Sequence, residues 1–155
     1  MKNILLIVIV LAAKTVTFAQ CYEYYLSYHC RPTPFEAKDM NLSSQSKSAY
    51  IEAYKTYSFQ MTLFRKMDYR IIFCAVERFY PVHYVLKDKN TGMVLFDNQT
   101  DEYVQSFSVS VEETIPVIAE VTLLANKAEF KDLRKDRTCL GIGIMYRRIP
   151  KMGFE

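Results

Sequence analysis

Apolar and polar residues alternate through much of the chain beyond its first third. In residues 54–64, "YKTYSFQMTLF", large apolar side chains recur at every second position. A period of two residues is typical of a strand with one buried face. The run 69–76, "YRIIFCAV", is apolar on both faces and therefore predicts a central strand of a sheet. With "RKMD" as the turn between them, the two runs are expected to form a hairpin.

Further strands are expected along the rest of the chain. The runs 82–88 and 93–97 flank "KNTG", in which Asn90 and Gly92 can adopt the positive φ angles of a tight turn, so they predict a second hairpin. Gly141 and Gly143 share one face of a predicted last strand, which indicates that another element approaches that face closely. The remaining predicted strands cover 102–111, 114–124 and 139–148, and the charged segment 126–138 fits a short helix or a solvated loop.

Together these patterns predict about seven to eight short strands separated by turns, and helical periodicity is nearly absent. This spacing predicts an all-β fold, an antiparallel β-sandwich of the jelly-roll or immunoglobulin-like type.

The chain begins "MKNILLIVIVLAA", a lysine and then an apolar run, followed by small residues. That order is typical of a secretory signal peptide, and the run is shorter than the about 20 residues of a membrane span.

We therefore expect a secreted or periplasmic protein with no membrane span after the signal is removed. The expected organisation is a signal peptide over 1–20, a cysteine-bracketed segment and linker over 21–48, the β-sandwich over 49–148 and a C-terminal tail over 149–155. The net charge of +3 includes Lys2 and Lys14 of the signal, so the mature chain is nearly balanced. A balanced charge gives no bulk attraction to nucleic acid, and no nucleic-acid partner is expected.

Four cysteines in an exported chain predict two disulfides, which would staple the sandwich. Cys21 and Cys30 bracket "CYEYYLSYHC", which has no glycine, proline or asparagine on which to turn. Either the segment folds back and Cys21 pairs with Cys30, leaving Cys74 to Cys139, or it is a strand and each cysteine pairs elsewhere; we favour the first. A lipid anchor at Cys21 is disfavoured, because it would need a small residue before the cysteine and a leucine in place of Phe18.

The residues with catalytic or metal-binding chemistry are few. The chain has two histidines, His29 and His83, and lacks the G-x-S-x-G and H-E-x-x-H motifs, so an enzyme is disfavoured. A Cys/His zinc site finds no standard ligand spacing. No cofactor is expected, and calcium is the one candidate, because several acids fall in neighbouring loops where they could serve as oxygen ligands or simply form turns. The acids concerned are Asp88, Asp97, Asp101 and Glu102.

Tyrosine is the most distinctive residue of the N-terminal segment. The chain has 12 tyrosines and no tryptophan, and "CYEYYLSYHC" holds the densest cluster. An apolar ring with a polar tip suits contact with a protein or a sugar. The alternative is that every second residue forms the buried face of a first strand. The candidate binding aromatics are Tyr22, Tyr24, Tyr25 and Tyr28.

The span from about Tyr54 to Tyr146 resembles the small β-sandwich modules of the bacterial pre-peptidase C-terminal type, found at the ends of secreted proteases. The resemblance is carried by the order of "YSFQMTLFRKMDYRIIF", "LKDKNTGMVLFDN" and "SFSVSVEETIPVIAEVTLL", followed by a closing strand. More closely, the chain is similar to short, uncharacterised exported proteins of Gram-negative bacteria that combine such a domain with two cysteine pairs. The resemblance implies a β-sandwich with no catalytic signature.

The function expected from these features is that of a non-catalytic secreted binding or accessory module, contacting a protein or a surface glycan. The alternatives are a small hydrolase using carboxylates between Asp97 and Glu102, or an inhibitor-like protein. A binding module should display exposed aromatic side chains. A hydrolase should bring together two carboxylates, at least one with a strongly perturbed pKa.

Overall fold

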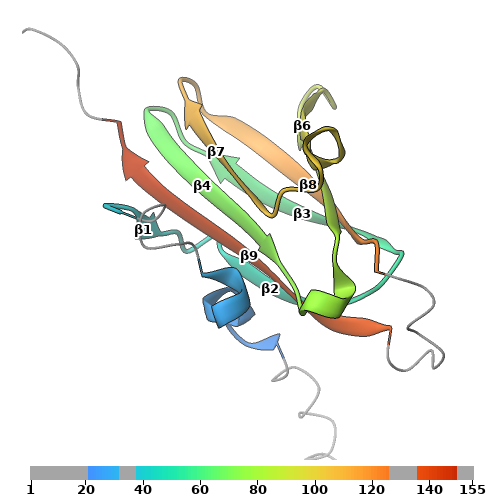
Figure 1. Cartoon of the computed structure of the whole chain (residues 1–155). Coiled ribbons are helices and arrows are strands. Elements are labelled where there is room, and N and C mark those ends of the chain that lie inside the picture. Colours follow the sequence, from blue (N-terminus) through green and yellow to red (C-terminus); the bar gives the residue numbers. More distant parts are fainter. Residues whose placement is uncertain (1–20, 32–37, 126–135, 150–155) are drawn as a thin grey trace, which may run out of the picture.

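The computed structural model describes residues 21–31, 38–125 and 136–149, so the predicted signal peptide lies outside the described residues. Within these ranges the fold is all-β, with nine strands in two antiparallel sheets and no α-helix (Figure 1). The two sheets pack face to face around one core, which confirms the predicted antiparallel β-sandwich.

The first sheet has the order β1/β2–β9–β4–β7, and the second the order β3–β8–β5–β6. The strands of the first sheet are β1 (Asn41–Leu42), β2 (Lys47–Glu52), β9 (Arg137–Arg148), β4 (Met67–Cys74) and β7 (Ser106–Val111). Those of the second are β3 (Thr56–Leu63), β8 (Ile115–Leu123), β5 (Val82–Asp88) and β6 (Val94–Asp97). Short 3-10 helices are η2 (Tyr24–Leu26), η3 (Tyr28–Cys30), η4 (Glu77–Phe79) and η5 (Asn98–Asp101).

Alternate residues of each strand form the core, as the period of two predicts. On β9 the inward side chains are Leu140, Ile142 and Ile144, all almost completely buried. The rings of Phe73 on β4 and Tyr84 on β5 stack across the two sheets with centroids 4.0 Å apart. The two-faced apolar run is confirmed as a central strand, since β4 lies between β9 and β7.

The predicted hairpin of 54–64 with 69–76 is wrong. β3 pairs with β8, whereas β4 pairs with β9 and β7, so the chain crosses from one sheet to the other after Leu63. Both strands point apolar side chains into the same core from opposite sides, and a period of two does not say which strand is the neighbour. The second hairpin, β5 with β6, is confirmed, and of its two candidate residues only Gly92 has a positive φ, 72°.

Two strands of the first sheet begin earlier in the sequence than expected. The end of the segment 21–48, expected to be a linker, contributes β1 and the first two residues of β2, and both strands pair with β9. β9 begins at Arg137, before the expected Cys139, and ends at Arg148 as expected. Residues 126–135 of the charged segment lie outside the described residues.

All four cysteines form disulfides, but the favoured pairing is wrong. Cys21 is bonded to Cys139 and Cys30 to Cys74, with Cα–Cα distances of 5.3 and 5.2 Å. The segment 21–31 neither folds back to join its own cysteines nor extends as a strand. It forms η2 and η3 and lies on the outer face of the first sheet, so each cysteine faces a different strand of that sheet (Figure 1).

The close approach predicted from the two glycines of β9 is confirmed at Gly141. A Cβ atom there would lie 2.6 Å from Cys30 Sγ, 2.7 Å from Cys74 Sγ and 2.9 Å from Tyr25 Cα. At Gly143 the nearest atom would be Ile72 Cβ at 3.9 Å, an ordinary contact. Only the first glycine is therefore required by packing.

Substitution of the two glycines should separate these roles. Gly141→Ala should lower the free energy of unfolding by about 2–3 kcal/mol, because a methyl group would have to displace the disulfide and the backbone of η2. Gly143→Ala, on the same strand and face, is the matched control and should change it by less than about 1 kcal/mol. Urea unfolding of both variants checks the prediction, and equal losses would contradict it.

Candidate functional site

The outer face of the first sheet is divided into an apolar part and a polar part. The segment 21–31 covers the apolar part, where the Cys30–Cys74 disulfide packs with Ile72 and Met145 in a small second core. Beyond Met145 the outward side chains of β9, β4 and β7 become charged or hydroxylated. The sheet thus offers two surfaces of different chemistry.

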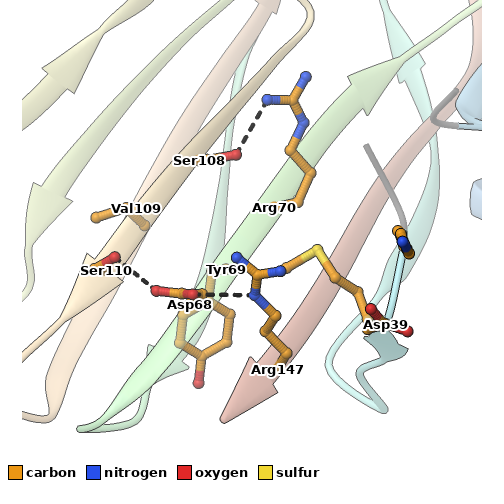
Figure 2. A pocket seen from close by; sticks show the side chains of 10 residues that line it. Asp39, Asp68, Tyr69, Arg70, Ser108, Val109, Ser110 and Arg147 are labelled. Atoms are coloured by element: carbon orange, nitrogen blue, oxygen red, sulfur yellow. Dashed lines mark hydrogen bonds and ion pairs between the residues drawn. The ribbon is translucent and has the colours of Figure 1, made fainter. Parts of the chain in front are cut away.

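The polar part forms a shallow cavity of about 530 Å³, which we call the polar groove (Figure 2). Cross-strand neighbours form its floor, because Asp68 lies opposite Ser110 on one side and Arg147 on the other, and Arg70 lies opposite Ser108. Residues 38–40 line it next to these strands. The full lining is Lys38, Asp39, Met40, Asp68, Tyr69, Arg70, Ser108, Val109, Ser110 and Arg147.

Hydrogen bonds order the charged groups of the polar groove. Ser110 Oγ donates to Asp68 Oδ1 at 2.6 Å, and Arg147 Nε donates to Asp68 Oδ2 at 3.1 Å. These partners, the serine first, hold the pKa of the Asp68 carboxyl below its usual range. The guanidinium of Arg70 reaches over β7 and donates to Ser108 Oγ at 3.1 Å and to Ser106 Oγ at 2.6 Å.

A second cavity, between the start of the N-terminal segment and β2, contains two of the four candidate tyrosines. Tyr22 and Tyr25 line a cavity of about 700 Å³ together with Tyr50 of β2. The backbone N–H of Tyr25 donates to Ser48 Oγ at 3.2 Å, and the Cys21–Cys139 disulfide fixes the start of the segment. Tyr22 is 78 % exposed and Tyr50 is 49 % exposed. We call Tyr22, Tyr25 and Tyr50 the tyrosine surface.

The other two candidate tyrosines lie elsewhere. Tyr24 packs against the small second core, and burial raises the pKa of its hydroxyl. Tyr28 is largely exposed, and its ring lies against that of His29 with centroids 3.7 Å apart. The alternative of a first strand with these tyrosines on its buried face is wrong, because the segment forms 3-10 helices and none of the four tyrosines is fully buried.

Tyr50 and the polar groove were not identified from the sequence. Tyr50 joins the tyrosine surface because β2 pairs with β9, so that Tyr50 lies opposite Cys139. The sequence pattern places Asp68 in the turn "RKMD", whereas in the structure it alternates with Arg70 on one face of β4. That alternation, together with the serines on one face of the 102–111 strand, was the available signal.

The four calcium candidates act as turn residues or remain exposed. Asp88 Oδ1 accepts hydrogen bonds from the backbone N–H groups of Asn90 and Thr91. Asp97 Oδ1 accepts from the backbone N–H of Gln99 and lies 3.0 Å from His83 Nε2, and these partners lower the pKa of its carboxyl. Asp101 and Glu102 are exposed. In the ranges that the structure describes, no three His, Cys, Asp or Glu side chains form a group that could hold a metal.

The loop that carries these acids is organised by a buried amide instead. Asn98 is completely buried, and its Oδ1 accepts from the backbone N–H of Tyr84 at 2.9 Å. Its Nδ2 donates to the carbonyl groups of Val82 and Val104. The side chain therefore ties η5, which follows β6, to β5 and to the segment just before β7.

Three carboxyls in the described part of the chain lack the environment of a general acid. The carboxyls of Glu52, Asp68 and Asp97 each have a lowered pKa and an ion-pair partner. General acid catalysis near neutral pH needs a raised carboxyl pKa, which burial produces. A third cavity, of about 430 Å³, has two carboxylates on its lining, Glu77 and Glu102, and both side chains are exposed.

Comparison with known proteins adds little. No protein-family model matches the chain, and no curated protein matches its sequence. A solved structure to which it is similar is that of PliG from Aeromonas hydrophila, a periplasmic lysozyme inhibitor of g-type lysozyme. The match has a TM-score of 0.44 and 7 % sequence identity, and covers 66 % of this chain and 84 % of that chain. Similarity at this level establishes no common function. The resemblance to pre-peptidase C-terminal modules stays a prediction.

Over the described part of the chain, no helix has the length and apolar character needed to cross a membrane. This statement concerns residues 21–31, 38–125 and 136–149.

The lowered pKa of Asp68 predicts how stability depends on pH. Its ion pair and hydrogen bond should stabilise the fold above the unfolded carboxyl pKa of about 4, and this contribution should be lost as the pH falls through the lower pKa of the folded state. Asp68→Asn should lower the free energy of unfolding by about 1 kcal/mol at pH 7 and should flatten its decline on acidification. Urea unfolding at pH 7 and at pH 3 measures both effects.

Glu112→Gln, at an exposed acid just beyond β7, serves as the control and should leave both quantities within error of the wild type. A constant difference between Asp68→Asn and the wild type at both pH values would contradict the assignment.

Proposed function

We propose that the protein is a non-catalytic binding module of the periplasm or cell exterior, and that it contacts a protein partner through the tyrosine surface. The observation that carries the proposal is the exposure of Tyr22 and Tyr50 on one cavity of about 700 Å³. Large exposed aromatic side chains gathered around a concave surface mark sites of interaction.

The construction of this surface supports a binding role. Tyr25 lies against Gly141 and hydrogen-bonds through its backbone to Ser48, while Cys21 is bonded to β9. A segment fixed in this way loses little conformational entropy when a partner binds, so more of the contact energy is available for affinity. The tyrosines are therefore presented on a support that needs no rearrangement.

A protein partner fits this surface better than a glycan does. Tyrosine is enriched at the energetically dominant positions of protein interfaces, and its hydroxyl can hydrogen-bond to a partner backbone. The chain has no tryptophan, the residue that flat sugar platforms favour. A surface glycan is kept as the alternative that the experiment distinguishes.

Site-specific photo-crosslinking tests the proposal. Replacing Tyr22 or Tyr50 by p-benzoylphenylalanine should yield, in extracts of the source cells, a crosslink to the same protein from both positions. The same replacement at Phe64 is the matched control, since Phe64 is 50 % exposed but lies on the turn after β3. It should give no such crosslink.

Different results would overturn the proposal. Equal crosslinking from Phe64, or none from Tyr22 and Tyr50, would contradict a protein contact at this surface. Co-sedimentation with purified peptidoglycan sacculi that is lost in Tyr22→Ser would indicate the glycan alternative. The inhibitor-like alternative would be supported if the protein slowed a lysozyme in a cell-wall clearing assay and Tyr22→Ser did not.

A further inference from the structure

Three of the four borders of the two sheets carry features that prevent pairing with another strand. At β3 the side chain of Gln45 occupies the border, because its amide pairs with both the N–H and the C=O of Thr62 at 2.7 and 2.8 Å. The ammonium group of Lys47 binds the carbonyl of Gln60 on the same border. Side chains bound along an edge strand block its use as a template.

The borders at β6 and at β1/β2 are interrupted in other ways. β6 has four residues, and its pairing with β5 shifts register between Leu86 and Lys87. β1 has two residues and is separated from β2 by a gap in the strand. On β2, the backbone N–H of Glu52 donates to the Tyr57 hydroxyl at 3.2 Å. Short strands, bulges and capped backbone groups are common protections of sheet edges.

β7 has none of these protections within the described part of the chain. Its six residues pair with β4 in regular register, and it contains neither proline nor lysine. The carbonyl groups of Gln105 and Val111 face β4, since they accept from Phe73 and Lys66. Backbone groups alternate in direction along an antiparallel strand, so the N–H and C=O groups of the serines between them face outward. Those residues are Ser106, Ser108 and Ser110.

The two faces beside this border have different chemistry. On the outer face the Arg70 guanidinium lies over Ser106 and Ser108, while the neighbouring Asp68 is engaged by Ser110 and Arg147. On the inner face Phe107 and Val109 pack on the core but remain partly exposed. An added strand would place alternate side chains on these two faces.

We propose that the border of β7, with which no other described strand pairs, binds an extended segment of a partner protein, which adds a strand to the first sheet and carries a carboxylate opposite Arg70. Apolar side chains at the neighbouring positions of that segment cover Phe107 and Val109. The exposed acids Glu112 and Glu113 follow β7, so a single central acid with basic ends suits the site better than a run of acids. Backbone hydrogen bonds supply affinity and the alternate side chains supply specificity.

This binding mode is independent of the function proposed for the tyrosine surface. β7 forms the border of the first sheet opposite to β2, which carries Tyr50 (Figure 1). Loss of one surface should therefore leave the other intact, and the failure of either proposal leaves the other standing.

The test uses the synthetic peptide Ac-Lys-Thr-Val-Glu-Val-Thr-Lys-NH₂, labelled with fluorescein, and measures its binding by anisotropy at low salt. Its glutamate and threonines share one face and its valines the other, as the site requires. The wild type should bind it saturably, and at least about tenfold more tightly than the same peptide with lysine in place of glutamate. Arg70→Gln should remove that preference.

Two proline variants test the backbone contact. Ser108→Pro removes one outward N–H of β7 and should weaken binding at least about tenfold. Ser58→Pro is the matched control, because Ser58 is an exposed serine whose backbone N–H, by the same alternation as that of Thr62, faces outward at the border of β3 and not at that of β7. It should bind the peptide like the wild type. Should Ser108→Pro fail to fold, amide exchange in the wild type gives the answer, since the peptide should slow exchange at Ser106, Ser108 and Ser110.

Several results would overturn the proposal. They are the absence of saturable binding, equal affinity for the glutamate and lysine peptides, equal loss in the two proline variants, and unchanged amide exchange at β7. A dimer in sedimentation equilibrium that Ser108→Pro abolishes would also overturn it, because the border would then be occupied by a second copy of the chain.

Discussion

The contact at Gly141 is the constraint on which the outer face of the first sheet depends. Two sulfur atoms and the backbone of η2 occupy the space that a side chain would take at this position. Because the backbone of the segment 21–31 packs directly against β9, Tyr24 and the Cys30–Cys74 disulfide can form a second core there. The same contact fixes the backbone of Tyr25, and with it one wall of the tyrosine surface. A larger residue at 141 would lift the whole segment rather than disturb one side chain.

The two disulfides hold the segment 21–31 in this arrangement. They span 118 and 44 residues of sequence, and the loop-entropy relation gives such links about 5 and 4 kcal/mol, through restriction of the unfolded chain. Three-residue 3-10 helices could not supply that stability themselves, since short helices are marginal in water. Each link joins the segment to a different central strand, which prevents it from pivoting about one bond. The backbone that carries the tyrosines is thereby held in place although the Tyr22 side chain is largely exposed.

Local patterns predicted the strands well and their partners poorly. The alternation in 54–64 and 139–148 specifies which side chains face the core, and it holds for β3 and β9 alike. Whether β3 pairs with β4 or faces it across the core depends on sheet order, which a period of two does not encode. The cysteine pairing failed for the same reason, because it follows from the position of β9 beside β4. The polar groove joins Asp68 to Arg147, two residues far apart in sequence that only the β4–β9 register brings together.

The outward residues of β9 decide where each surface lies. In order they are Cys139, Gly141, Gly143, Met145 and Arg147. The first forms a disulfide, the next two are glycines, the fourth has an apolar side chain and the last is positively charged. The small residues admit the N-terminal segment, Met145 closes the second core, and Arg147 begins the polar groove by pairing with Asp68. The described segment 21–31 occupies one end of this strand, and the polar groove lies at the other end, beside β4 and β7. One strand therefore separates a tyrosine surface from a polar groove, and the border of β7 beside that groove is left without the protection found at the other borders described.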